Sequence, residues 1–230
     1  MPLPDDSSAL VSALIFDLDG VLVDSEIWWD DVRRAWAAGH GRTWTAADRA
    51  AVMGANSAAW ARTMRERLGL PLLEAATIGR EIVDGVVARY AREGAPEIDG
   101  AVAAVRRLRA SFRLGLASSA HPAVIAAALA ATGLADAFAV VVSSDEVAEG
   151  KPAPDVYLEA ARRLAVAPAA CLVIEDSLNG VRAARAAGMT VVLVPNVAVP
   201  PPTEAYAEAD LVLNRLADLE PWAIRPRQPS

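Results

Sequence analysis

Hydrophobic residues recur along the chain as short apolar runs that alternate with longer stretches of helical periodicity. Short apolar runs bounded by turn residues predict buried strands, and helical segments between them predict crossover connections of a parallel α/β sheet. The predicted strands are residues 13–16, 113–117, 139–142, 171–174, 190–194 and 211–213. The predicted helices include residues 100–110, 122–132, 155–164 and 180–187, the last with Gly188 as its C-terminal cap.

One long stretch, from about residue 25 to residue 93, departs from this alternation because it is helical in pattern and contains no strand-like run. We therefore expect a Rossmann-like parallel sheet core formed by residues 10–24 and 95–230, with an inserted all-helical cap domain at residues 25–94. Five of the six tryptophans lie in the insertion, and they form either the core of a helical bundle or, for one or two of them, the wall of a substrate pocket. They are Trp28, Trp29, Trp36, Trp44 and Trp60.

Two carboxylates follow the first predicted strand directly, in the order Asp17, Leu18, Asp19, Gly20. Residues i and i+2 of a strand point to the same side, so Asp17 and Asp19 can face one site. Two negative charges at that spacing destabilise the fold unless a cation, a proton or hydrogen-bond donors compensate them. The pair therefore predicts a site for a divalent metal.

Polar residues also follow the next three predicted strands. Ligands of open parallel sheets bind beyond the carboxyl ends of the strands, so these residues are expected to converge. Each has a purely structural alternative, because serine and acidic residues cap helices and a lysine before a proline can be an ordinary surface residue. The residues are Ser118 and Ser119 after the second strand, Lys151 after the third, and Glu175, Asp176 and Ser177 after the fourth.

Lys151 is the only lysine among the 22 lysine and arginine residues of the chain. Where the sequence needs only positive charge it uses arginine, so the single ammonium indicates a site that requires a compact point charge instead of a planar fork. An ammonium on a flexible stem suits a phosphate oxygen or a crowded carboxylate.

Composition narrows the classes of protein that are compatible with the chain. A formal charge of -7 and a pI near 4.9, without a block of basic residues, argue against binding nucleic acid or an anionic membrane surface through bulk charge. Residues 1–8 lack the cationic and apolar regions of a signal peptide, and Cys171 alone cannot form an internal disulfide. We expect a soluble, cytoplasmic protein.

Four motifs stand in order along the predicted core. They are Asp-Leu-Asp-Gly-Val at 17–21 with Asp-Ser-Glu at 24–26, Ala-Ser-Ser at 117–119, Gly-Lys-Pro-Ala-Pro-Asp at 150–155, and Ile-Glu-Asp-Ser at 174–177. This ordered set resembles the haloacid dehalogenase-like hydrolase superfamily, in its phosphatase and β-phosphoglucomutase-like branch with a helical cap after the first motif. The resemblance covers the chain from residue 10 to about residue 219.

The resemblance implies chemistry on two acids. Asp17 would be the nucleophile that forms an aspartyl-phosphate, and Asp19 the general acid and base. Mg2+ would be held by an oxygen of Asp17, the backbone carbonyl of Asp19 and Asp176, with Glu175 as an outer-shell partner or a ligand through water.

The resemblance also implies a phosphate-binding set. Ser118 would donate a hydrogen bond to the transferring phosphoryl group, and Lys151 would bridge that group to Asp17. Ser119 offers a second hydroxyl beside Ser118. The expected partner of the protein is a small phosphorylated metabolite, and the expected assembly is a monomer or a homodimer.

Two departures from the mutase pattern favour a hydrolase. The resemblance implies that a β-phosphoglucomutase carries a histidine where this chain has Trp29. It also implies an arginine that binds the second phosphate in a cap loop that here reads Met-Gly-Ala-Asn-Ser at 53–57, with no arginine until Arg62. Asp19 favours phosphoryl transfer over dehalogenation, because a leaving alcohol needs a proton. We expect a Mg2+-dependent phosphatase for a sugar or polyol phosphate with an otherwise uncharged alcohol. A sugar-phosphate mutase and a non-enzymatic binding protein with this fold remain the alternatives.

Overall fold

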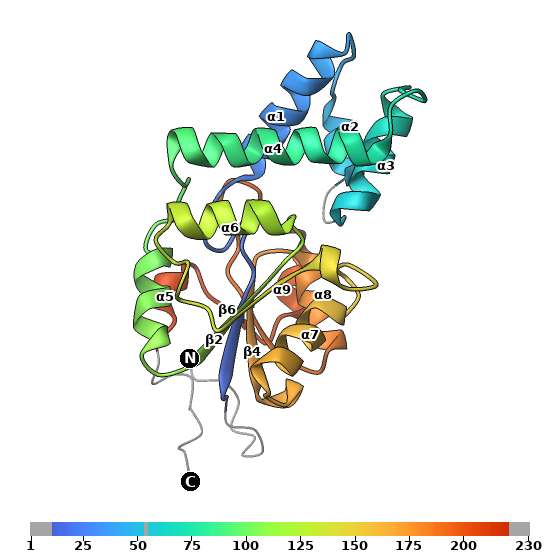
Figure 1. The fold of residues 1–230 in the computed structure, drawn as a ribbon. Helices are drawn as coiled ribbons and strands as arrows, with labels where there is room; N and C mark the ends of the chain where they lie inside the picture. Colours follow the sequence, from blue (N-terminus) through green and yellow to red (C-terminus); the bar gives the residue numbers. More distant parts are fainter. Residues whose placement is uncertain (1–10, 53–54, 221–230) are drawn as a thin grey trace.

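The computed structural model describes residues 11–52 and 55–220, and these residues form a parallel sheet with helices on both faces and a helical insertion at one end (Figure 1). The predicted tail at 1–8, the cap-loop residues Met53 and Gly54, and Trp222 lie outside the described residues. The sheet has the strand order β3-β2-β1-β4-β5-β6, and all of its pairings are parallel. Its strands are β1 (Ala13–Phe16), β2 (Arg113–Ser118), β3 (Val140–Ser143), β4 (Cys171–Glu175), β5 (Thr190–Leu193) and β6 (Leu211–Val212).

The predicted α/β fold class is confirmed, with every predicted strand present and small differences at the strand ends. Ser118 was expected just after β2 but pairs with Ser143 inside the sheet, and Glu175 was expected just after β4 but pairs with Leu193. The ladders continue one residue beyond the apolar runs, because backbone hydrogen bonds set the end of a strand and side-chain polarity does not.

The four residues of β1 are fully buried and alternate between two cores. Leu14 and Phe16 pack on the side of the sheet that is covered by α5 (Ala101–Arg109) and α6 (Pro122–Ala131). Ala13 and Ile15 face the other side. That side is covered by α7 (Asp155–Leu164), α8 (Leu178–Ala186) and α9 (Thr203–Glu208). β1 is therefore the centre of a three-layer structure, and its carboxyl end is fixed on both faces.

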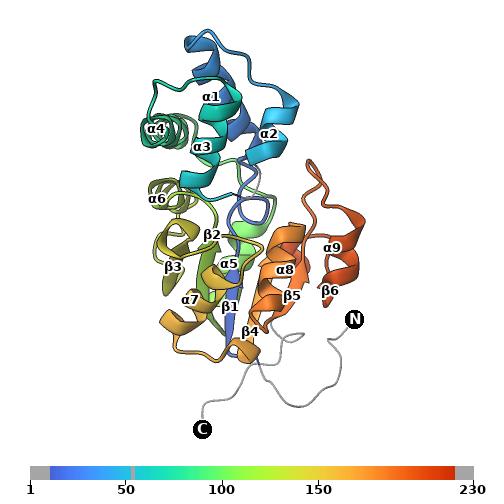
Figure 2. The ribbon, with the colours of Figure 1, turned by 90° about the vertical axis from the view of Figure 1, so that its right-hand side faces the viewer.

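The long helical stretch forms four helices that lie together beyond the end of the sheet, with α4 passing over α6 (Figures 1 and 2). Trp29, Trp44 and Trp60 are buried among these helices, as a bundle core requires. The division of the chain into a core and a cap domain stays a prediction. The helices are α1 (Glu26–Gly39), α2 (Ala46–Val52), α3 (Ser57–Arg67) and α4 (Ala75–Glu93).

Short connections complete the described chain. The described residues also form three 3-10 helices, η1 (Ser144–Glu146), η2 (Pro168–Ala170) and η3 (Leu216–Asp218). Helix α8 begins two residues earlier than its apolar pattern predicts, because the Ser177 hydroxyl accepts a hydrogen bond from the Gly180 amide and caps the helix. Among the described residues, no helix combines the length and the hydrophobicity that a membrane span requires.

Candidate active site

The side chain of Lys151 joins three strands of the sheet at their carboxyl ends. Its ammonium donates to Asp17 Oδ1 at 2.6 Å, to Glu175 Oε1 at 2.6 Å and to the Ala117 carbonyl at 3.2 Å. Lys151 and Asp17 are separated by 134 positions in the sequence. The sole ammonium and two of the predicted acids therefore meet in one buried network.

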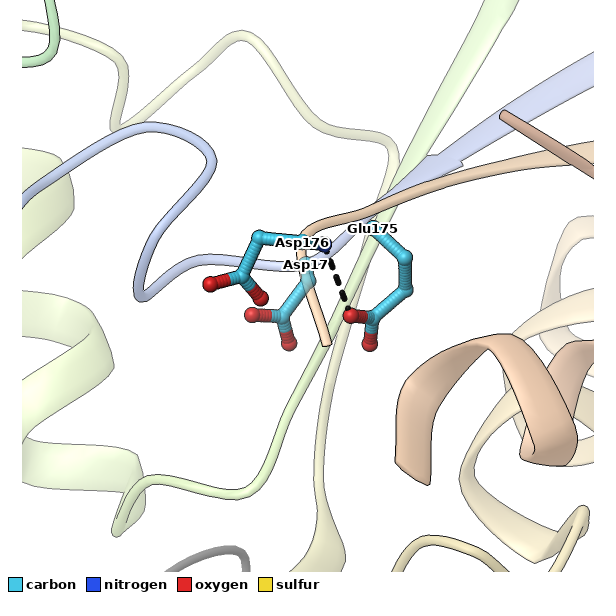
Figure 3. Close-up of side chains that lie close together, drawn as sticks. All are labelled: Asp17, Glu175 and Asp176. Atoms are coloured by element: carbon cyan, nitrogen blue, oxygen red, sulfur yellow. Dashed lines mark hydrogen bonds between the residues drawn. The ribbon is translucent and has the colours of Figure 1, made fainter. Parts of the chain in front are cut away.

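Three carboxyl groups gather at the ends of β1 and β4 (Figure 3). Asp17, Glu175 and Asp176 each offer an oxygen, and these oxygens lie within 4.8 Å of one another. One ammonium cannot neutralise three carboxylates. A set of hard oxygen donors with excess negative charge fits a divalent cation such as Mg2+ or Ca2+.

Burial and the excess of negative charge together raise the pKa values of Asp17 and Asp176. Desolvation raises the pKa of Asp17 to about 7, with Lys151 opposing it and with Glu175 and Asp19 adding to it. Desolvation, together with Glu175 and Asp17, also holds the pKa of Asp176 well above its usual value. The full ionisation of this cluster therefore requires further positive charge.

Both carboxylate oxygens of Glu175 accept several hydrogen bonds from other groups of the protein. Its Oε1 accepts from Lys151 and, at 2.7 Å, from the Tyr157 hydroxyl, and its Oε2 accepts from the amides of Asp176 and Ser177 and from the Ser177 hydroxyl. Burial alone would raise the pKa of Glu175, but Lys151 and these donors outweigh it and lower the pKa. This bonding favours the outer-shell role of Glu175 over direct metal ligation, because it positions Lys151.

Tyr157 is a member of the network that sequence reasoning missed. It is fully buried on α7, and its ring centroid lies 4.8 Å from the Lys151 nitrogen. The sequence signal was weak, because an aromatic residue on the inner face of a helix is usually a core residue. Only the contact with Glu175 reveals its polar role.

Two glycines allow the acids to pack directly against backbone. A Cβ at Gly20, where φ is +83°, would lie 1.9 Å from Asp176 Oδ2, and a Cβ at Gly180 would lie 1.7 Å from Glu175 Oε1. Neither requirement for glycine was predicted from the sequence. Both positions leave room for a carboxylate where any other residue would place a methylene or methyl group.

We expect Gly180→Ala to destabilise the protein and to lower its catalytic rate, although alanine favours a helix over glycine by about 1 kcal/mol. The new methyl group would displace Glu175, and Lys151 would move with it. A loss of about 1–3 kcal/mol in the free energy of unfolding, typical of overpacking, should appear in chemical denaturation. The control is Gly79→Ala in α4, whose Cβ would lie 3.5 Å from Ala61 in ordinary contact. An equal response of the two variants would contradict this packing argument.

Asp19 lies in the loop after β1, and its Oδ1 accepts a short hydrogen bond from the Ser25 hydroxyl. Burial raises the pKa of Asp19, with Ser25, Lys151 and Arg33 opposing the shift. A raised pKa favours the protonated carboxyl, which is the form that can donate a proton to a leaving group. The arrangement suits a general acid.

Ser118 is buried at the end of β2, and its hydroxyl oxygen accepts from the Ala120 amide at 3.0 Å. No described residue takes the hydroxyl hydrogen as an acceptor, which leaves that hydrogen for a group in the cavity. Ser119 lines the same cavity.

All seven predicted site residues line one cavity of about 420 Å³ beneath the helical insertion. The insertion supplies the opposite wall, and Trp29 and Trp60 are both buried among its helices and part of the cavity lining. Sequence reasoning missed Arg33 and Arg49 in this wall. The signal for Arg33 was its place four residues after Trp29 on the buried face of α1, where an arginine interrupts an apolar stripe.

A profile of the family described as haloacid dehalogenase-like hydrolase matches residues 11–188, which include every site residue named above. The protein belongs to the haloacid dehalogenase-like hydrolases. The predicted superfamily is thus confirmed, and the chain is an enzyme of the hydrolase class.

Relatives within the haloacid dehalogenase-like hydrolases are phosphatases by name. The chain is 34% identical over 232 residues to the bifunctional riboflavin kinase/FMN phosphatase of Arabidopsis thaliana, covering 99% of this chain. It spans only 60% of that relative's length. It is also 32% identical over 189 residues to the phosphorylated carbohydrates phosphatase of Thermotoga maritima, covering 78% of this chain and 82% of the relative.

A solved structure of the same family has a closely similar fold. CbbY from Rhodobacter sphaeroides in complex with phosphate superposes with a TM-score of 0.82 at 27% identity, over 94% of this chain and 99% of that one. The similarity extends over both the sheet and the helical insertion, because almost the whole of each chain is covered.

Proposed function

We propose that the protein is a Mg2+-dependent phosphatase that hydrolyses a small phosphate monoester, a sugar or polyol phosphate, through an aspartyl-phosphate on Asp17. The observation that carries the proposal is the pairing of Asp17 with Lys151 at 2.6 Å, beside Asp176 and on a cavity shared with Asp19. The names of the two relatives support phosphate ester hydrolysis, and one of them supports a carbohydrate phosphate.

In the first half of the reaction, an Asp17 oxygen attacks phosphorus and the bond from phosphorus to the alcohol oxygen breaks. The Asp19 carboxyl gives its proton to the departing alkoxide. Lys151 and the Ser118 hydroxyl bind the oxygens of the phosphoryl group as it moves. Mg2+ held by Asp17, Asp176 and the Asp19 backbone carbonyl would neutralise charge on the phosphoryl oxygens.

In the second half, water attacks the phosphorus of the aspartyl-phosphate and Asp19 takes the proton from that water. The bond from phosphorus to Asp17 breaks, and inorganic phosphate leaves. The helices α1 to α4 act as a cap that excludes bulk water from the cavity during this cycle.

Purified protein should release inorganic phosphate from carbohydrate phosphates in the presence of Mg2+, and a chelator should abolish the release until Mg2+ is restored. A panel of phosphate esters assayed for inorganic phosphate tests this directly. Interconversion of sugar phosphate isomers, stimulated by a bisphosphate and without net phosphate release, would instead identify a mutase. Absence of metal affinity and of turnover across the panel would identify a non-enzymatic binding protein.

Asp19→Asn should slow the first half-reaction only for esters whose leaving group needs a proton, and it should slow the second half-reaction for every ester. A nitrophenolate leaves without a proton, so the variant should release one equivalent of nitrophenolate from 4-nitrophenyl phosphate in a burst and then turn over slowly. An alkyl phosphate needs the missing acid, so its hydrolysis should fall by about 10²–10⁴-fold without a burst. Rapid-quench kinetics measure both, and a burst of equal size with the two esters would exclude Asp19 as the acid.

Three further expectations accompany the proposed function. The substrate is a small metabolite and not a nucleic acid, the protein acts as a monomer or a homodimer, and it is located in the cytoplasm. Size measurement in solution and fractionation of cells are the tests of the last two.

A further inference from the structure

Arg33 lies in the wall that the helical insertion contributes to the cavity. Its side chain comes from the middle of α1, only 9% of the residue is exposed, and it lines the cavity together with Asp19. The guanidinium carbon lies 4.9 Å from the ring centroids of both Trp29 and Trp60. Two indoles from different helices, which are themselves in edge-to-face contact with ring centroids 6.1 Å apart, thus both pack against the guanidinium group.

This guanidinium makes no hydrogen bond and no ion pair within 4.0 Å among the described residues. The Nε atom of Arg33 is buried without a hydrogen bond, and no described carboxylate lies within 4.0 Å of the side chain. Its neighbour Arg34, in contrast, pairs with Asp30 at 2.5 Å. Burying an unpaired cation costs free energy, so a position that keeps one implies an anion from outside the protein.

The Arg33 guanidinium remains positively charged at neutral pH. Burial lowers the pKa of Arg33 to about 10, with Asp30, Asp19 and Glu26 opposing the shift, so the group stays protonated. Arg49 on α2 adds a second, exposed cation to the same wall. Glu26 is the one acid that the insertion contributes to the described lining of the cavity, against the two arginines. The wall therefore presents net positive charge to a bound molecule.

Binding of the phosphoryl group that is cleaved does not require Arg33. Lys151, Ser118 and the metal-binding acids come from the sheet, whereas Arg33 comes from the insertion. Arg33 acts electrostatically on Asp19, the proposed acid for the leaving alcohol. Because the insertion forms the wall opposite Lys151 and Ser118, Arg33 lies on the leaving-group side of the cavity.

We infer that Arg33 is a specificity-determining residue that binds a second anionic group, a carboxylate or a second phosphate, on the alcohol portion of the substrate. The inference rests on the proposed function for the identity of the cleaved ester. A planar guanidinium forms two parallel hydrogen bonds with either anion, and packing against the two indoles restricts its motion before the substrate arrives. This inference differs from the sequence-based expectation of an otherwise uncharged alcohol, which considered the cap loop and the tryptophans around it.

The test compares molecules that differ in the second anion. One pair is fructose bisphosphate and fructose monophosphate, and the other is phosphogluconate and glucitol phosphate. Their dissociation constants are measured by calorimetry on the Asp17→Asn protein in Mg2+, so that binding is read without turnover. At least one pair should show tighter binding of the doubly anionic member by about tenfold or more, the effect of one charge-assisted hydrogen bond. The pair that responds identifies the anion as phosphate or carboxylate.

Arg33→Met keeps an unbranched apolar side chain against the two indoles and removes the charge. In the same background it should abolish the preference while leaving the singly anionic member within about threefold, since that member makes no hydrogen bond to the guanidinium. Arg33→Lys should retain part of the preference for the doubly anionic member. This variant replaces Arg33→Met in the test if Arg33→Met does not fold. Arg62→Met, an exposed arginine of α3 outside the cavity, should leave the preference intact.

Equal binding within both pairs, or a preference that survives Arg33→Met, would overturn the inference. Failure of the proposed function is a separate result, because it would appear as no phosphate release by the unmodified protein from any ester, whatever the calorimetry shows.

Discussion

Replacing Asp17 with asparagine is expected to lower phosphate release by about four orders of magnitude or more, the scale found when a catalytic nucleophile is removed. A carboxamide oxygen is a poor nucleophile and cannot form the acyl phosphate. The side chain keeps its size and can still accept the hydrogen bond from Lys151, so the fold should persist. Steady-state release of inorganic phosphate from the best ester of the panel measures the loss.

The control for this variant is its thermal unfolding in the presence of a chelator. Asparagine removes a buried carboxylate whose pKa is raised by desolvation, so the melting temperature should not fall by more than a few degrees. Retention of more than one tenth of the original rate by a folded Asp17→Asn protein would exclude Asp17 as the nucleophile.

Lys151→Met is the second change with a large expected effect, because the ammonium is the common partner of Asp17 and Glu175 at 2.6 Å each. Its removal leaves two buried carboxylates without their cation, which should lower the free energy of unfolding by about 3–5 kcal/mol. The pKa of Lys151 lies well above its usual value despite burial, which shows how strongly these acids hold the charged form. Chemical denaturation in a chelator measures the loss, and phosphate release should fall to background.

A double variant separates stability from catalysis at this position. Lys151→Met with Glu175→Gln removes the charge of one orphaned acid along with the ammonium, so it should recover part of the lost stability. It should recover no activity, because the cation that binds the phosphoryl group is still missing. A single Lys151→Met variant as stable as the unmodified protein would contradict the buried network described above.

The sequence allowed the sheet and the central acids to be predicted because both depend on local rules. Apolar runs such as 171–174 are too short and too uniformly apolar for surface helices, and parallel strands bring their carboxyl ends to one edge. Asp17, Lys151 and Asp176 could therefore be placed together without coordinates. The predicted strands ended one residue before the observed ends of β2 and β4, because Ser118 and Glu175 are polar residues inside a hydrogen-bonded ladder.

The cap side of the cavity could not be predicted from the same rules. Which face of α1 meets the sheet depends on how four helices pack with one another, and no local pattern fixes that docking. Arg33 therefore looked like an ordinary charged residue in a helix that begins with Glu26. The requirement for glycine at 180 was hidden for a related reason, since only the folded chain brings Glu175 against the first turn of α8.

The most direct test of the account is to trap the phosphorylated enzyme. Protein mixed with a carbohydrate phosphate in Mg2+, quenched in acid within a single turnover and analysed by peptide mass spectrometry, should carry one phosphoryl group on Asp17. Asp19→Asn should increase its yield from 4-nitrophenyl phosphate by slowing the attack of water. Phosphate release in that turnover without any phosphorylated Asp17, or with the phosphoryl group on another residue, would contradict the account.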